Sequence, residues 1–277
     1  MTARLLRALV YAGAIATSLV LGGIVAYILA NGVPHLAPSL FEWDYTSENV
    51  SLMPALASTV LMAALSLAMA VPVGVGAAIY LVEYARPSSR FVRAVRMTAE
   101  TLQGIPSIIY GLFGLLFFTT ALGWGLCLLS GACTLAIMVL PVVMRTSEEA
   151  LLAVPASYRQ GGFALGAGNV RTVFRCVLPS ALPGMLGGIL LALGRCVGEV
   201  AALLFTAGTV AQIPDFAGQG PFALFDSCRT LAVHMYVLAS EGLHMDETYA
   251  TVVVLLGLVV ALNAAANFAA KRLEKGM

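Results

Sequence analysis

Two charged residues lie four positions apart inside an otherwise apolar stretch of this sequence. Arg195 and Glu199 belong to residues 180–207, which are nearly all apolar or small. A spacing of four places both side chains on one face of a helix. Either charge alone costs roughly 3 kcal/mol in hydrocarbon, so we expect the two to pair and to face protein or water. One interpretation is a structural ion pair that fixes helix packing. The other is that Arg195 presents its N–H donors to a passing oxyanion while Glu199 holds it in place.

A polar segment, residues 145–178, precedes this stretch and separates it from the previous apolar one. Pro155 is expected to break the helix that continues out of the preceding apolar stretch. Ala156 to Leu165 then predicts a short helix lying parallel to a membrane, which Gly166 and the pair Gly168-Asn169 end. Leu178-Pro179 begins the next long helix. A short helix tethered at both ends is able to transmit a push from a partner protein, and a plain surface loop is the alternative.

The composition identifies the class of protein that these segments belong to. Of 277 residues 60% are hydrophobic and 10% are charged, with a mean hydropathy of +0.93. A soluble domain carries about a quarter charged residues. The sequence therefore predicts an all-α integral membrane protein, because six apolar stretches reach the length of about 20 residues that a spanning helix needs. The six are residues 8–30, 54–82, 97–121, 124–144, 180–207 and 249–270.

The basic residues predict the orientation of these six spans. Of the 15 Lys and Arg residues, all but Arg195 and Arg229 fall on one side if the chain alternates across the membrane. Positive charge gathers on the cytoplasmic side of membrane proteins, so both termini are predicted to be cytoplasmic. The expected organisation is a single transmembrane domain over residues 1–277, with a core at about 54–270 and a cytoplasmic segment at about 145–178.

Enzyme signatures are absent from the sequence. It contains no Walker phosphate-binding loop, no HExxH and no GxSxG motif. The histidines at 35, 234 and 244 fall in the predicted outer loops, where we interpret them as solvated side chains rather than metal ligands. The five cysteines form no CxxC pair, and those at 127, 133 and 196 are expected to be buried small hydrophobic residues. We therefore predict no catalytic site, no metal and no cofactor in this chain. If the protein works against a gradient, another polypeptide must supply the energy.

The chain resembles a known family, the permease subunits of ABC importers, and most closely the PstA-type phosphate permeases. Such permeases carry a Glu-Ala-Ala, three residues, Gly pattern (the EAA loop) in a cytoplasmic helix, and here Gln160 to Gly166 occupy that frame. The resemblance covers nearly the whole chain. It also rests on Thr146-Ser147-Glu148-Glu149-Ala150, Ala78 to Ala85, Gly104 to Leu112, Thr230 to Tyr236 and Asn263.

The resemblance implies a type I ABC importer permease in the bacterial cytoplasmic (inner) membrane that transports inorganic phosphate by alternating access. Its implied partners are a homologous PstC-like permease, a PstB-like ATPase dimer that binds ATP and Mg, and an extracytoplasmic PstS-like phosphate-binding protein. Arg195 and Glu199 would line the substrate pathway. The residues implied to contact the ATPase are Glu149, Tyr158, Arg159, Gln160, Gly161, Gly162, Ala164, Leu165 and Gly166.

Two departures from the family pattern are visible. Gln160-Gly161-Gly162 replaces Glu-Ala-Ala, which exchanges two good helix formers for glycine at about 1 kcal/mol each; we expect the reverse replacement to be tolerated. The family pattern Arg-x-x-Gly-Glu-Thr-Ala-Pro appears as Arg195 to Ala202, without the hydroxyl and the proline. Three alternatives stay open: a permease for molybdate, tungstate or sulfate, a self-sufficient secondary transporter or channel, and a membrane-embedded enzyme.

Overall fold

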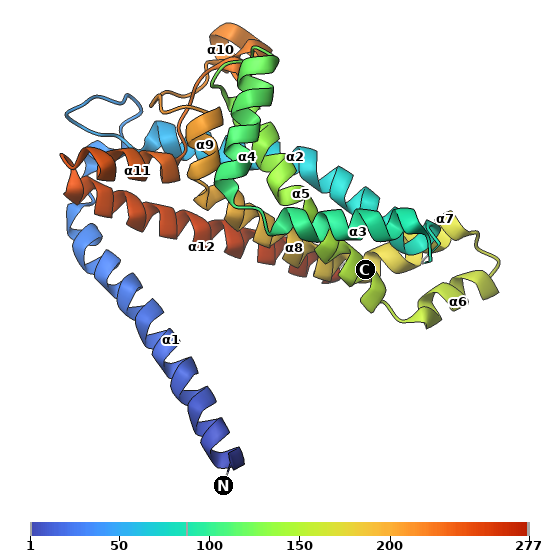
Figure 1. The fold of residues 1–277 in the computed structure, drawn as a ribbon. Helices are drawn as coiled ribbons and strands as arrows, with labels where there is room; N and C mark the ends of the chain where they lie inside the picture. The colour runs from blue at the N-terminus through green and yellow to red at the C-terminus, as the bar shows by residue number, and fades with distance from the viewer. Residues whose placement is uncertain (1, 87, 276–277) are drawn as a thin grey trace.

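A computed structural model describes residues 2–86 and 88–275, and this part of the chain is helical without any strand (Figure 1). Five helical segments are long and apolar enough to cross a membrane, and a bent pair of helices supplies a sixth, as the sequence predicts. The elements that build them are α1 (Thr2–Gly32), α2 (Met53–Ile79) with η3 (Tyr80–Tyr84), α3 (Arg90–Gln103) with α4 (Ser107–Gly114) and η4 (Leu115–Ala121), α5 (Leu128–Ala153), α7 (Asn169–Thr172) with η5 (Val173–Val177) and α8 (Leu178–Gly198), and α12 (Met245–Lys275).

Shorter helices connect the long ones. They are η1 (Val33–His35), η2 (Pro38–Phe41), α6 (Ala156–Ala164), α9 (Ala201–Thr206), α10 (Phe216–Gln219), η6 (Gly220–Phe225) and α11 (Leu231–Glu241). In Figure 1, α6 lies at one end of the molecule, whereas α11 lies at the opposite end beside the start of α12.

The core is formed by α2, α5 and α8. Met62 of α2 and Leu135 and Met138 of α5 are fully buried there. Two of the five glycines that the sequence places near Arg195 bring α8 against α5: a Cβ on Gly184 would lie 2.8 Å from the Cβ of Ala150, and Gly188 faces Thr146. Small residues at such positions let helix backbones approach closely. The remaining three, at 187, 194 and 198, have no neighbour within 4 Å of a built Cβ.

The third predicted span, residues 97–121, is sharply bent. Its first seven residues belong to α3, and the chain then bends by 102° before α4. Pro106 is the cause, because a proline disfavours helical backbone at the preceding residue and cannot donate a helical hydrogen bond itself. Tyr110 fixes the bend, since its hydroxyl donates to the Leu102 carbonyl at 2.9 Å.

The first helix stands apart from this core. No residue in the most apolar 18-residue window of the α1 span is buried, and Figure 1 shows α1 diverging from the rest of the chain. It contacts α12 near its C-terminal end, where Tyr27 meets Tyr249 edge to face at 6.0 Å and Gly32 packs on the Tyr249 backbone. An apolar helix exposed in this way needs lipid or another subunit around it.

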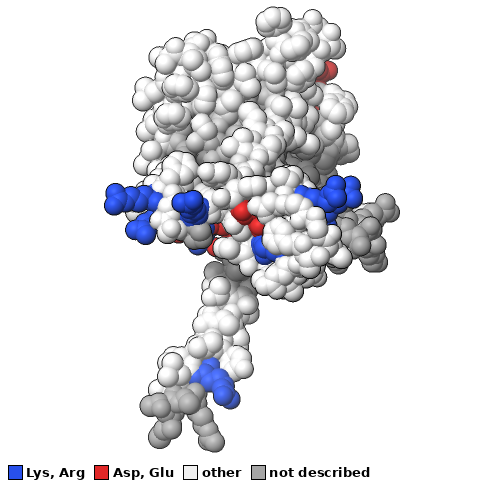
Figure 2. Space-filling view, turned by 90° about the vertical axis from the view of Figure 1, so that its right-hand side faces the viewer, with Lys and Arg blue, Asp and Glu red and all other residues white. Residues whose placement is uncertain are grey.

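Basic residues gather on one face of the molecule. Figure 2, which views the α6 end of Figure 1, shows Lys and Arg side chains around this face with acidic side chains in a recess between them, while the upper part of the view is almost uncharged. The distribution agrees with the charge asymmetry on which the predicted orientation rests. The cytoplasmic placement of the termini stays a prediction.

Candidate functional site

The predicted Arg195–Glu199 ion pair is absent from the structure. Helix α8 ends at Gly198, and Glu199 follows with extended backbone angles, φ −77° and ψ 129°. The two residues therefore do not share a helical face, and no ion pair or hydrogen bond joins their described side chains. The fifth predicted span, 180–207, is correspondingly wrong as one continuous helix, since Glu199 and Val200 separate α8 from α9.

Glu199 instead serves the start of α9. Its Oε1 accepts a hydrogen bond from the Ala202 backbone N–H at 3.2 Å, which satisfies one of the N–H groups that a helix leaves free in its first turn. The family pattern places proline at this position, and proline has no N–H to donate. Because this chain has Ala202 where the family pattern has proline, Glu199 has a backbone N–H to bind.

Packing between α9 and α4 accounts for the break. A Cβ on Gly111 of α4 would lie only 2.8 Å from the Ala202 Cα, and Gly114 faces the Thr134 and Thr206 side chains. The α9 backbone can approach α4 this closely only because these two α4 residues are glycines. Since α4 is itself turned away by the 102° bend, a straight continuation of α8 would not follow it.

Arg195 is left without a partner by this arrangement. Its side chain is half-buried in the last turn of α8, and among the described residues it has no hydrogen bond and no ion pair. It lies near enough to Tyr110 of α4 for a Coulombic interaction. An arginine fork without a counter-ion inside a span is available to bind an anion.

The predicted short helix of the polar segment is confirmed. Helix α6 runs from Ala156 to Ala164, and Pro155 separates it from α5. Gly166 ends the turn with φ +77°, a left-handed conformation that favours glycine. Helical structure resumes at Asn169, earlier than the Leu178 start that the sequence suggests, because η5 continues without interruption into α8.

Arg159 anchors α6 to neighbouring parts of the chain. Its guanidinium binds the Glu83 carboxylate, with Nη2–Oε1 at 2.5 Å and Nε–Oε1 at 3.1 Å. The same group donates to the carbonyls of Leu151 and Val154 at 3.1 Å each, which are free at the end of α5. One side chain therefore ties α6 to the ends of both α2 and α5. Glu83 lies 76 positions away, and no local sequence signal indicates this pairing.

Much of α6 and of the turn after it is exposed. Tyr158, Phe163 and Leu165 expose 49%, 50% and 90% of their surfaces. The other predicted coupling residues of this segment that are exposed are Gln160, Gly161, Ala164 and Gly166. Gly162 is the exception, because it is buried against α7, where a Cβ would lie 2.8 Å from the Thr172 side chain.

Known proteins are similar to this chain in sequence and in fold. Residues 70–277 match the family of binding-protein-dependent transport system inner membrane components. The chain is 34% identical to the probable ABC transporter permease protein YqgI of Bacillus subtilis, over 82% of this chain and 80% of that protein. The chain belongs to the family of binding-protein-dependent transport system inner membrane components. It is therefore an ABC transporter permease of the inner-membrane class, and the predicted resemblance is confirmed.

Two further comparisons extend this result. The permease is 39% identical to the phosphate transport system permease protein PstA 1 of Mycobacterium tuberculosis, a match that covers 56% of this chain and 50% of that protein. A crystal structure of a bacterial alginate ABC transporter with its alginate-bound periplasmic protein aligns over 94% of this chain and 95% of that one, with a TM-score of 0.63 and 15% identity. At this identity the structural match shows the fold alone, which is the expected ABC importer permease fold.

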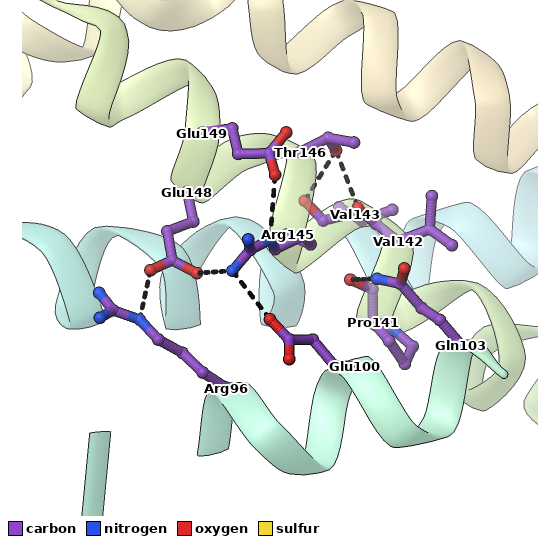
Figure 3. A network of polar contacts seen from close by, with 10 residues as sticks. All are labelled: Arg96, Glu100, Gln103, Pro141, Val142, Val143, Arg145, Thr146, Glu148 and Glu149. Carbon is purple, nitrogen blue, oxygen red and sulfur yellow. Dashed lines mark hydrogen bonds and ion pairs between the residues drawn. The ribbon is translucent and has the colours of Figure 1, made fainter. Parts of the chain in front are cut away.

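A network of ion pairs around the buried Glu148 joins the start of the polar segment 145–178 to α3 (Figure 3). Glu148 of α5, with 1% exposure, binds Arg96 of α3 at 2.6 Å. Arg145 joins Glu148 at 3.8 Å and Glu100 at 3.5 Å, and its Nε contacts Glu149 at 3.0 Å. Sequence reasoning assigned Glu149 to ATPase contact and gave Glu148 no role. In the structure Glu148 links α3 to α5, and Glu149 keeps a largely exposed side chain.

Proposed function

We propose that this permease is a transmembrane subunit of an ATP-driven importer that carries inorganic phosphate across the bacterial cytoplasmic membrane. The observation that carries the proposal is the unpaired Arg195 at the break between α8 and α9, in a chain similar to phosphate transport permeases. Phosphate fits an arginine well, because the planar guanidinium offers parallel N–H donors to a tetrahedral oxyanion.

Arg195 is suited to transient binding. Its partial exposure leaves it accessible, and its charge is not neutralised by Glu199, whose Oε1 is engaged with the Ala202 N–H. A site that conducts must attract an ion without holding it, and a single arginine with few other donors meets that requirement. We assign Arg195 to anion contact and Glu199 to holding the bend beside it.

Helix α6 supplies the contact with the energy source. Tyr158, Phe163 and Leu165 expose large apolar side chains on α6 and the turn after it, and exposed apolar side chains of this kind favour a protein partner. We assign these side chains to contact with a cytoplasmic ATPase dimer, which binds ATP and Mg while the permease itself contributes no catalytic group. Because Arg159 ties α6 to α2 and α5, displacement of α6 pulls on both spans.

The remaining partners are those that a permease forming one half of a transport pathway requires. A second, homologous permease would complete the pathway around Arg195, and an extracytoplasmic phosphate-binding protein would deliver the anion at the α11 end. The whole chain 1–277 acts as a single transmembrane domain in this scheme. The spans alternate between inward-facing and outward-facing states as the ATPases close and open.

Uptake of radiolabelled phosphate tests the proposal. Cells that lack other phosphate transporters receive the importer genes with wild-type permease, Arg195→Ala or Arg195→Lys. We expect Arg195→Ala to abolish uptake and Arg195→Lys to retain part of it, while both variants still co-purify with the ATPase. Arg93→Ala, an exposed arginine on α3, is the matched control and should transport normally.

Normal uptake by Arg195→Ala would remove the anion-contact role. If unlabelled sulfate or molybdate competed better than phosphate, the permease class would stand and the proposed substrate would be wrong. Absence of any ATPase in the purified complex would contradict the importer assignment itself.

A further inference from the structure

A second unpaired arginine lies buried at the α11 end of the molecule. Arg229 has 4% exposure, and its Nε and Nη2 atoms have no hydrogen-bond partner. No carboxylate among the described residues lies within ion-pair distance of it. The nearby Asp226 carboxylate accepts from the Asp215 backbone N–H at 3.1 Å. A buried cation without a counter-ion is strongly unfavourable, so it indicates a missing anion.

His234 adds a second set of unsatisfied atoms. It is fully buried near the start of α11, where it interacts with the Val50 backbone, and neither ring nitrogen has a hydrogen bond of good geometry. The prediction of a solvated loop histidine was therefore wrong. Burial and the positive charge of Arg229 lower the pKa of His234 to about 3, against the opposing effect of the Val50 backbone. The ring is therefore neutral at physiological pH, with one N–H donor and one acceptor nitrogen.

Tyr45 brings these two residues together. Its ring lies 4.6 Å from the Arg229 guanidinium carbon and meets His234 edge to face at 6.1 Å. The loop that carries Tyr45 is held by internal hydrogen bonds, among them Asn49 Nδ2 to Glu42 Oε2 at 2.8 Å.

Backbone strain marks the same place. Val50 is fully buried with φ +46°, which is unfavourable for a β-branched residue and persists only where the surroundings impose it. On the other side, the Arg229 backbone N–H donates to Val210 at 3.0 Å. The residues around Arg229 are therefore held in place by their surroundings.

We propose that Arg229 and His234, closed over by Tyr45, form an enclosed binding site for one small inorganic oxyanion, separate from Arg195. The two free atoms Nε and Nη2 form the side-on fork of a guanidinium, which suits two oxygens of one oxyanion. His234 lies beside this fork across the Tyr45 ring, and the anion neutralises the buried charge. A water molecule would satisfy the hydrogen bonds but not the charge. The site goes beyond the proposed function, because its chemistry does not require that the transported anion be phosphate.

The purified importer complex tests the site through its thermal stability. Melting is followed in phosphate-free buffer while sodium phosphate or sodium sulfate is added, with sodium chloride at matched ionic strength as reference. We expect both oxyanions to stabilise the wild type and also the Arg195→Gln variant, in which the remaining response reports binding away from Arg195. Arg229→Lys keeps the charge but loses the fork, and we expect at least about tenfold weaker binding from the lost charged hydrogen bond.

Arg229→Met distinguishes an anion site from a structural cation–π contact. Without oxyanion the variant should be at least as stable as the wild type, because it removes an unpaired buried charge, and with phosphate the order should reverse. His234→Gln should bind several-fold more weakly. The proposal is overturned if phosphate stabilises Arg229→Met and Arg229→Lys as it does the wild type, or if Arg229→Met is equally destabilised with and without phosphate. Loss of the phosphate response in Arg195→Gln would also overturn it. Intact binding at Arg229 with no phosphate uptake would uphold this site and contradict only the proposed transport function.

Discussion

Two adjacent glycines of α6 should respond in opposite directions to the same substitution. Gly161 is exposed, and a Cβ built on it meets nothing within 4 Å. Gly162 is buried, and its Cβ would lie 2.8 Å from both Cγ2 and Oγ1 of Thr172. We therefore expect the Glu-Ala-Ala replacement of Gln160-Gly161-Gly162 to be tolerated at Gly161 and to be unfavourable at Gly162.

The magnitudes follow from helix propensity and packing. Alanine in place of an interior helical glycine gains about 0.5–1 kcal/mol, and Gly161→Ala should realise that gain. Gly162→Ala has the same gain but adds overpacking, which costs about 1–3 kcal/mol. The two variants should thus differ by roughly 1–3 kcal/mol in the free energy of opening α6, although each adds one methyl group.

Hydrogen–deuterium exchange of residues 156–166 in the purified complex measures this opening directly. Gly161→Ala should slow amide exchange by about twofold to fivefold, since 1 kcal/mol corresponds to about a factor of five. Gly162→Ala should leave exchange unchanged or accelerate it.

Removal of the clashing atoms supplies the control. Thr172→Ala deletes Cγ2 and Oγ1, and that hydroxyl has no hydrogen-bond partner to lose, so the single variant should change exchange little. Combined with Gly162→Ala it should restore protection, as expected for residues in direct contact. Equal protection in the two single glycine variants would refute the reasoning, because the Gly162–Thr172 contact would then impose no cost.

Two further predictions concern the other buried ionisable side chains. Arg159→Ala leaves Glu83 buried without a partner and frees two α5 carbonyls, so α6 should lose up to about 3 kcal/mol of local stability. The α6 amides should then exchange roughly a hundredfold faster, with Arg159→Lys between this variant and the wild type. Unchanged exchange would show that α6 does not need the Arg159 contacts. For His234, whose pKa is lowered to about 3 from 6.5, the unfolded chain binds a proton that the folded chain does not, so stability is full above pH 6.5 and falls as the pH drops toward 3, by about 1.4 kcal/mol per pH unit. Thermal melting in phosphate-free buffer should show this acid sensitivity in the wild type and a flatter profile in His234→Gln, and identical profiles would contradict the burial of a neutral ring.

Local chemistry was enough to predict much of this permease. The length of the apolar stretches indicates the spans, because only a helix satisfies its backbone polar groups in hydrocarbon. Pro155 and Gly166 delimit α6, because each acts on its own backbone. The unusual Arg195 and the family frame around Gly166 were equally visible. All these features depend on residues close together in the chain.

Tertiary structure alone decided the rest. The break after Gly198 arises where α9 packs on Gly111 and Gly114, about 90 positions earlier. Glu199 therefore lies outside the helix of Arg195, and their spacing of four does not pair them. Arg159 meets Glu83 across 76 positions, and His234 is buried beneath a loop from the other end of the chain. Periodicity and spacing describe what a segment prefers by itself. Which charges become neutralised, capped or left without a partner depends on the segments that fold against them.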